Sequence, residues 1–303
     1  MRCGTRERLY QRPQAAPEKA ETPAMNRTPE PTRRRLLLTA GLSTGLSTCL
    51  SAWQQPALAN ADARPADKAD PQALLAASDA VRNPGQPFSV NLVITEFDAG
   101  KRVDSSSYIT YSRTLSEGAQ FASLVRFTAP ARDAGKLMLK SGNEMWFFDP
   151  ATKASVRLSP QQRLMGQASN GDVVTVNLAR DYRAVLEAEE DIQDGERKPR
   201  RAHRLALTAA TPDATYERIE LWLDRDNSQP IKGRFLAASG RLLKTVYYRR
   251  YQPQMGTARP TELVIIDGLN PQSVTLMRLS DYTPRQIPAS WFQRDYLPRL
   301  QAD

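Results

Sequence analysis

Histidine and cysteine are nearly absent from this sequence of 303 residues, which has one His and two Cys. Zinc sites and facial-triad iron sites draw on several imidazoles, so a single His203 excludes His-rich metal centres. Both cysteines, Cys3 and Cys49, fall in the first fifty residues. Disulfides, thiol catalysis and iron–sulfur clusters therefore depend on whether that first stretch stays in the working protein.

The first 59 residues are typical of an export signal. After Met25, the basic run 33–35 leads into the apolar and small residues 36–52, and Ala57-Leu58-Ala59 is a small-x-small cleavage site. We expect cleavage near Ala59 and export to the periplasm. Residues 1–24 precede a more typical start at Met25, so we expect them to lie upstream of the true start.

The export route and the fate of the signal each have an alternative. The run 32–37, Thr-Arg-Arg-Arg-Leu-Leu, fits a twin-arginine signal, but the Lys that usually follows is missing and the Sec route stays open. An uncleaved anchor would have to use 36–52, which is short for a bilayer span and diluted by Gly, Ser and Thr. A lipoprotein signal ending at Cys49 is a weaker fit, because its −1 position holds Thr48.

Removing residues 1–59 leaves 244 of the 303 residues and no cysteine. The removed part holds nine basic and four acidic residues, so the net charge falls from +9 to +4. A charge of +9 alone would suggest nucleic acid as a partner, and +4 does not. We expect a disordered lead at 60–69 and one domain at 70–303, with no nucleic-acid partner.

The mature chain is predicted to begin with a helix and continue mainly as strands. Asp70-Pro71 is an N-cap followed by Pro at the first helical position, and Asn83-Pro84-Gly85 ends the helix. In the next segment Phe88, Val90, Leu92 and Ile94 alternate, which is typical of a half-buried strand. Further strands are expected at 103–113, 121–127, 202–208, 216–224, 231–237, 241–251, 262–267 and 273–279.

Short, evenly spaced strands favour an antiparallel sheet, sandwich or barrel. Short helices are also expected at 160–164, at 180–189 and as a terminal turn at 289–294. The charged stretch 187–201 has no interleaved aromatics and is predicted to be a solvated turn. The polar stretch 159–172, with its apolar Leu164 and Met165, is predicted to be a lid or long loop crossing the sheet.

A hairpin around Gly142-Asn143 is the most informative local feature. A two-residue loop there pairs Leu137 with Phe148 and Leu139 with Trp146. One face then carries these four side chains and the other carries Met138, Met145 and Phe147. Because both faces are apolar, the hairpin should be covered on both sides, for which a helix and a cavity are the candidates.

Three stretches together resemble the outer-membrane lipoprotein-sorting, LolA-like family. The first is 130–150, which contains Lys136-Leu-Met-Leu-Lys140 and Trp146-Phe-Phe-Asp-Pro150, and it continues through 156–159 into 165–172. The others are Glu220-Leu-Trp-Leu-Asp224 with 230–232, and Ser239-Gly-Arg-Leu-Leu-Lys244. The resemblance covers most of residues 70–300.

The resemblance implies a mainly β fold, an incomplete antiparallel barrel with a few helices forming a lid over a hydrophobic cavity. It implies a non-enzymatic periplasmic carrier of lipid or lipoprotein acyl chains, without a cofactor or metal, and with an inner-membrane transporter as a further candidate partner. We predict that the cavity is lined by nine apolar residues: Leu92, Val125, Phe127, Leu137, Leu139, Trp146, Phe148, Leu164 and Met165.

Two other functions compete with the carrier. The same fold could serve as an accessory or sensor subunit of an envelope exporter of the RND or MMPL type, which predicts an exposed apolar patch and little internal cavity. A hydrolase would have to use His203 as its imidazole base. Its position between Ala202 and Arg204 on a predicted strand instead favours an exposed strand residue.

Overall fold

The computed structural model describes residues 69–114, 116 and 120–300. All of these residues belong to one compact unit of the chain, Asp62–Asp303. The expected signal, its cleavage site and both cysteines lie outside the described residues.

Within the described residues the fold is one open antiparallel sheet of thirteen strands, in the order β6-β5-β4-β3-β2-β1-β15-β14-β13-β12-β11-β10-β9. The predicted β class and incomplete barrel are confirmed: the described edge strands β6 and β9 do not pair with each other. The strands are β1 (Phe88–Asp98), β2 (Lys101–Thr114), β3 (Phe121–Ala129), β4 (Leu137–Ser141), β5 (Glu144–Asp149), β6 (Ala154–Arg157), β9 (Tyr182–Gln193), β10 (Pro199–Ala209), β11 (Arg218–Asp224), β12 (Pro230–Leu236), β13 (Leu242–Gln254), β14 (Thr257–Asp267) and β15 (Ser273–Pro284).

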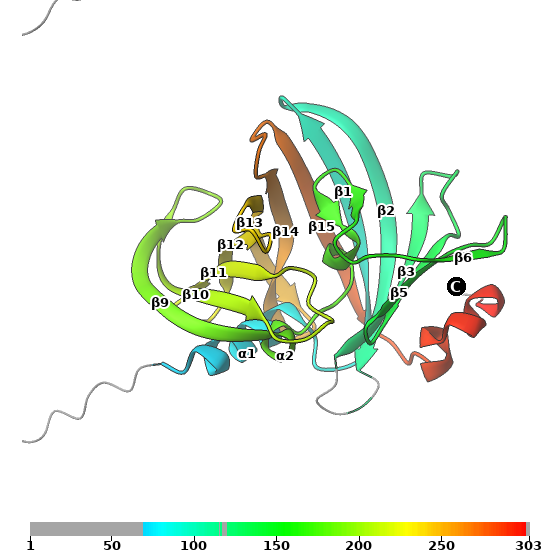
Figure 1. Ribbon diagram of the computed structural model, residues 1–303, viewed down its shortest axis with the longest axis horizontal. Helices are drawn as coiled ribbons and strands as arrows, with labels where there is room; N and C mark the ends of the chain where they lie inside the picture. The colour runs from blue at the N-terminus through cyan, green and yellow to red at the C-terminus, as the bar shows by residue number, and fades with distance from the viewer. Residues whose placement is uncertain (1–68, 115, 117–119, 301–303) are drawn as a thin grey trace, which may run out of the picture. The chain divides into compact units, whose positions relative to one another are not determined.

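The sheet is strongly curved. Figure 1 shows β9 to β12 arching on one side and β2 to β6 on the other, with α1 and α2 across one end. Buried side chains from both sides, such as Tyr108 of β2 and Ile219 of β11, belong to one hydrophobic cluster on the inner face. We call this face the concave face. Curvature lets one sheet enclose its own core without a second sheet.

The predicted first helix is α1 (Pro71–Arg82). The carboxylate of Asp70 accepts a hydrogen bond from the backbone N–H of Gln72 at 2.9 Å, which is the N-cap that its position indicated. Leu75 and Ser78 face the core and are fully buried. The helix ends at Arg82, and Asn83 is its C-cap before Pro84.

The hairpin of β4 and β5 has the predicted register, with Leu137 opposite Phe148 and Leu139 opposite Trp146. Gly142 in its turn has φ of 55°, a conformation that suits glycine. Both faces are covered: Met138 and Met145 join the concave cluster, and the opposite face is covered by the C-terminal 3-10 helices Ala289–Phe292 and Arg294–Arg299.

Two helix predictions were wrong. The stretch expected to be helical at 180–189 forms only the short α2 (Leu178–Asp181) and then enters β9. Exposure alternates strictly along β9, because the chain there pairs with β10 and this pairing overrides the helix propensity of Ala, Leu and Glu. At 160–164 a turn leads into β7 (Arg163–Met165), which pairs with β8 (Ala168–Ser169).

Two smaller expectations also need correction. The charged stretch 187–201 is mostly strand, and its turn is confined to the residues between β9 and β10. His203 lies on β10 as expected but is buried, with 6% of its surface exposed. Its Nδ1 atom is 3.6 Å from a carboxylate oxygen of Glu189.

Candidate functional site

A chain segment runs through the hollow of the concave face, and we call residues 170–177 the strap. It joins β8 to α2 and begins with one 3-10 turn, Asn170–Asp172. Val173 and Val174 in the strap are buried, although the strap is not part of the sheet. The segment thus fills space that an open, curved sheet would otherwise leave for a ligand.

The strap divides the hollow into two apolar compartments of about 100 Å³ each. They share Arg82, Asp172, Val174, Val176, Tyr248 and Leu263 as common walls. The first compartment lies toward β11 to β14, and its other main lining residues are Leu178, Tyr182, Tyr216, Ile219, Phe235, Val246 and Ile265. The second lies toward β1, β2 and β15, with Phe88, Val90, Leu92, Met277, Leu279 and Tyr282 among its lining residues.

Hydroxyl groups of the sheet hold the middle of the strap. Thr110 donates its Oγ1 hydrogen to the carbonyl oxygen of Val173 at 3.0 Å. The backbone N–H of Thr175 donates to Ser123 Oγ at 3.1 Å, and the hydroxyls of Thr175 and Ser112 lie 2.7 Å apart. Thr110, Ser112 and Ser123 are almost completely buried on β2 and β3. These polar groups are satisfied by the strap, so its displacement would leave them in need of water or other partners.

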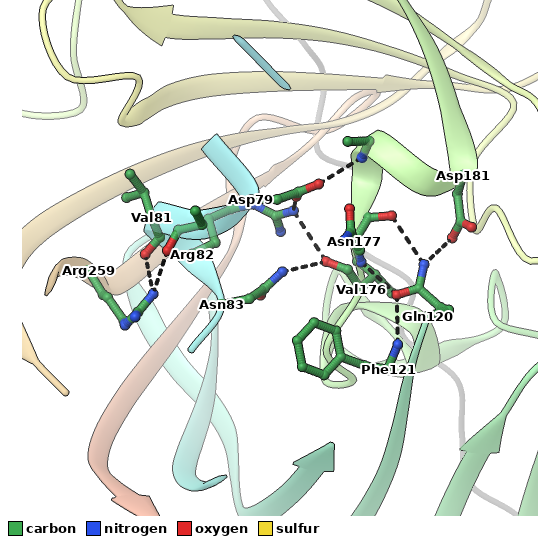
Figure 2. Close-up of polar contacts among 12 residues, drawn as sticks. Asp79, Val81, Arg82, Asn83, Gln120, Phe121, Val176, Asn177, Asp181 and Arg259 are labelled. Atoms are coloured by element: carbon green, nitrogen blue, oxygen red, sulfur yellow. Dashed lines mark hydrogen bonds and ion pairs between the residues drawn. The ribbon is translucent and has the colours of Figure 1, made fainter. Parts of the chain in front are cut away.

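Side chains of α1 and of its C-cap residue Asn83 hold the end of the strap (Figure 2). Asn83 donates from Nδ2 to the carbonyl oxygen of Val176 at 2.8 Å, and Arg82 donates to the same oxygen at 3.3 Å. Asp79 pairs with Arg82 and accepts a hydrogen bond from the backbone N–H of Ala179 at 2.7 Å. The helix and the strap are therefore coupled and would have to move together or separate at these bonds.

Gln120, just before β3, completes this set of contacts. Its Oε1 accepts from the N–H of Asn177 at 2.7 Å, and its Nε2 donates to the carbonyl of Asn177 at 3.1 Å and to Asp181 at 2.8 Å. Burial raises the pKa of the Asp181 carboxyl, opposed by hydrogen bonds from Thr211 and Gln120. On the other side of α1, Arg259 donates to the carbonyls of Ala80 and Val81 near the helix end, as Figure 2 shows.

The start of the strap is held by a buried ion pair. Lys244 of β13 bonds to the carboxylate of Asp172, which also accepts hydrogen bonds from the N–H of Ser169 at 2.7 Å and from the Tyr216 hydroxyl at 2.9 Å. Lys244 Nζ lies 4.8 Å from the ring centre of Tyr216 and 5.5 Å from that of Phe235. Burial lowers the pKa of the Lys244 ammonium, and Asp172 opposes this shift.

The nine predicted cavity residues lie on two different faces. Leu92 lines the second compartment, and Val125, Phe127, Met165 and the partly buried Leu164 belong to the same concave cluster. The other four residues of the prediction lie on the outer face of β4 and β5, packed against Ile287, Phe292 and Leu297: Leu137, Leu139, Trp146 and Phe148. The structure therefore does not bring the nine residues together around one space.

Sequence reasoning missed most of the residues that line the compartments. Tyr216, Ile219, Phe235, Val246 and Ile265 come from the second half of the sheet, whose alternation predicted strands but not which face would enclose a space. One signal was present: 173–176 reads Val-Val-Thr-Val directly after a polar loop. An apolar run outside the strand pattern indicates a segment that enters the core.

Reactive groups are sparse in the described part of the chain. No group of three His, Cys, Asp or Glu side chains lies close enough there to hold a metal ion. No helix in the same ranges is long and apolar enough to cross a membrane. The arrangement that stands out is an apolar interior crossed by a strap with polar anchors, which is suited to binding.

The chain is similar to several solved structures. A LolA superfamily protein of Nitrosomonas europaea is 32% identical, with a TM-score of 0.67, and the match covers 76% of this chain and all of that one. A DUF1329 family protein of Desulfovibrio piger is 22% identical, with a TM-score of 0.64 and 75% and 99% coverage. A candidate outer membrane lipoprotein-sorting domain of Vibrio parahaemolyticus is 18% identical, with a TM-score of 0.62 and 75% and 98% coverage.

The second and third of these structures show the fold alone, whereas the first is similar enough in sequence to show the family. A family model described only as an uncharacterized protein matches residues 120–299. No curated protein matches the chain. From the identity to the Nitrosomonas protein over the whole of its length, together with the open thirteen-stranded sheet, this chain belongs to the LolA superfamily.

Proposed function

We propose that this protein is a periplasmic, non-enzymatic carrier or binder of lipid acyl chains, with a part in lipoprotein sorting or lipid trafficking. The observation that carries the proposal is the strap, which occupies the apolar hollow of the concave face and separates two compartments. Its residues Val174 and Val176 face both compartments, so they occupy the place that an apolar ligand would take.

The size of the compartments indicates that the strap must move for a long chain to bind. Each holds about 100 Å³, whereas a cavity that accepts benzene measures about 150 Å³. Lifting the strap would join the two compartments into one groove that reaches from β1 and β2 to β11. Each methylene buried there would contribute about 0.8 kcal/mol, so a chain of a dozen carbons could offset the broken hydrogen bonds.

The polar anchors of the strap suit a closure that opens. Most are neutral hydrogen bonds in which Thr110 and Asn83 donate to the strap and Ser123 and Gln120 accept from it, each with a net value of about 1 kcal/mol. A closure held by apolar packing alone would expose only apolar groups to water when it opened. A closure held by hydroxyls and amides can exchange these partners for water.

The proposal includes the expected processing of the chain. Residues 1–59 would be removed as an export signal, 60–69 would be a lead, and 70–303 would form the single acyl-binding domain. The strand and helix order of residues 71–299 supports one domain, because the N-terminal helix packs against β9 and β14 in the second half of the sheet. Secretion of a fusion to residues 1–59 in a strain lacking the twin-arginine translocase would separate the two export routes.

Binding is tested with the mature chain and a fluorescent fatty-acyl probe, with native mass spectrometry for lipid that co-purifies. The variant Val246→Phe adds a ring inside the first compartment, and Val103→Phe places the same change at an exposed position of β2. We expect saturable binding, a loss of at least tenfold in affinity for V246F, and none for V103F. Circular dichroism and thermal unfolding verify that both variants fold.

If the wild-type chain binds no probe and carries no lipid, the carrier proposal is wrong. Recovery of a stoichiometric inner-membrane transporter with an empty interior would instead support the accessory-subunit alternative. A probe that binds V246F and wild type equally well would place the site outside the compartments.

A further inference from the structure

A chamber with several charged side chains in its lining adjoins the first apolar compartment, on the other side of the Lys244–Asp172 ion pair. It holds about 210 Å³, twice the volume of either compartment. Lys244 and Tyr216 form its inner end, and its remaining lining residues come from the segment around β7 and β8 and from the ends of β13 and β14: Gln161, Arg163, Gln167, Ser169, Arg241, Leu242, Leu243, Asp267 and Leu269.

The ion pair is the partition between the chamber and the apolar interior. Lys244 lines the chamber but neither compartment, whereas Asp172 lines both compartments but not the chamber. Tyr216 lines both the chamber and the first compartment, and its hydroxyl bonds to Ser169 and Asp172 across the partition. A chamber that holds cationic side chains and an apolar compartment therefore meet at three side chains.

The chamber is biased toward anions. Three cations line it, Lys244, Arg163 and Arg241, against the single carboxylate of Asp267. Arg163 lies 3.9 Å from Asp267 and remains largely exposed, so this pair is weak. Arg241 is exposed and forms no ion pair with any residue that the structure describes. Two exposed guanidinium groups and one buried ammonium suit the bidentate binding of a phosphate.

Asp172 has the contacts that a bound anion would have. Its carboxylate pairs with the Lys244 ammonium and accepts hydrogen bonds from the N–H of Ser169 and the hydroxyl of Tyr216. Asp172 is itself a residue of the strap. An anion in the chamber would approach the same ammonium from the opposite side. It would compete with Asp172 for Lys244, and loss of that bond would release the start of the strap from β13.

We propose that the chamber is a headgroup site for an amphiphile with a phosphate group, whose acyl chain enters the first compartment while the phosphate binds Arg163, Arg241 and Lys244. This inference rests on the proposed function and specifies its ligand. Binding of the phosphate and displacement of the strap are then coupled, because Asp172 must leave Lys244 as the phosphate arrives. An uncharged amphiphile would lack that means of opening the interior.

The test is isothermal titration calorimetry of the mature chain with three ligands below their micellar concentrations: dodecyl phosphate, dodecyl maltoside and inorganic phosphate. The site variant is Arg163→Gln/Arg241→Gln, which changes two exposed residues. The control Arg197→Gln/Arg218→Gln removes the same charge from two exposed positions outside the chamber. Circular dichroism verifies the fold of both.

Wild type is expected to bind dodecyl phosphate about tenfold more tightly than dodecyl maltoside, a difference of about 1.4 kcal/mol, since only the phosphate forms charge-assisted contacts. The site variant should lose this preference and keep its affinity for dodecyl maltoside, and the control should keep both. Added salt should weaken only dodecyl phosphate binding.

Each other outcome overturns the headgroup site. If wild type binds the two amphiphiles equally well, or if the site variant keeps the preference for dodecyl phosphate, the headgroup site is wrong. The proposed carrier function is not affected by either result. Inorganic phosphate bound as tightly as dodecyl phosphate would show a site for the free ion, without a role for the chain. If neither amphiphile binds, the proposed carrier function is wrong, and the headgroup site is wrong with it.

Discussion

The Lys140 ammonium and a carboxylate oxygen of Asp213 lie 3.6 Å apart, although the strand and the loop that carry them lie near opposite edges of the open sheet. Lys140 belongs to β4, third from one edge, and Asp213 lies in the loop from β10 to β11, next to the other edge. The lysine side chain is 2% exposed, and its ammonium also bonds to the carbonyl of Gly142. This pair therefore connects the two ends of the sheet, which no pairing between strands in the described residues joins.

Asp213→Asn should destabilise the protein, because it leaves the buried Lys140 without its counter-charge. Removal of one partner of a buried pair typically costs about 3–5 kcal/mol, and the 19% exposure of Asp213 argues for the lower end or less. Urea unfolding gives the free energy. Asp226→Asn, at an exposed turn position, is the matched control and should change it by less than about 0.5 kcal/mol. Equal effects of the two substitutions would show that the pair does not connect the sheet ends.

Gln120→Leu should loosen the strap and so make acyl binding easier. The change removes hydrogen bonds to both backbone groups of Asn177 and to Asp181, with little change in volume. We expect a loss of about 1–3 kcal/mol in unfolding free energy and a higher affinity for an acyl probe, because less energy is needed to displace the strap. Titration with the probe measures this. Gln286→Leu, at an exposed position, should alter neither quantity. A lower affinity in Q120L would mean that the strap contributes to the bound state.

Trp146→Ala should leave acyl binding unchanged. Its ring lies on the outer face, with the Arg294 guanidinium 4.0 Å from the ring centre, and packs with the C-terminal cluster. The expected effect is a loss of stability of about 0.5–1 kcal/mol or more from the cation–π contact and the packing. Leu263→Asn, inside both compartments, should instead weaken probe binding at least tenfold, because it places an amide in an apolar space. Weaker probe binding by W146A would show that Trp146 contributes to the ligand site after all.

Local patterns in the sequence predicted most of the fold. The cap at Asp70, the alternation of Phe88 to Ile94 and the Gly142-Asn143 hairpin all have short-range causes, and each element formed as expected. The helix expected at 180–189 was wrong, because the Ala, Leu and Glu residues of that stretch favour helices locally whereas most of it lies in β9. The stretch becomes a strand because it pairs with β10, and this pairing cannot be recognised from the sequence of one strand alone.

The candidate site was harder to predict, because it depends on which face of the sheet closes on itself. Leu139 and Met138 are equally apolar neighbours, and only the direction of sheet curvature places Met138 inside and Leu139 under the C-terminal helices. The C-terminal residues Ile287 and Phe292 cover the outer face, so that face needed apolar side chains for packing alone. The two apolar faces of the hairpin therefore predicted correctly that both faces are buried. They did not show which face borders a space for a ligand.

Glu262→Gln should reduce the dependence of stability on acid pH. Glu262 is 2% exposed, and its carboxylate lies 2.7 Å from Arg249 Nε, 3.0 Å from Arg250 Nε and 3.2 Å from Arg278 Nε. Burial alone would raise the pKa of this carboxyl, but the Arg278 hydrogen bond and the other two guanidinium charges outweigh it and lower the pKa below 4.5. A carboxyl with a lowered folded-state pKa stabilises the fold above its unfolded pKa, and this stabilisation is lost as the pH falls through the folded value.

At neutral pH E262Q should therefore be less stable than wild type, by about 2 kcal/mol given the partial exposure of the arginines. The difference should shrink as the pH falls below about 4.5, because protonated Glu262 and Gln are then equally uncharged. Urea unfolding of both chains between pH 7 and pH 3 measures it. Glu144→Gln, at an exposed position of β5, is the control and should follow wild type throughout. A difference that stays constant over this range would show that Glu262 contributes by shape and hydrogen bonding and that its charge adds nothing.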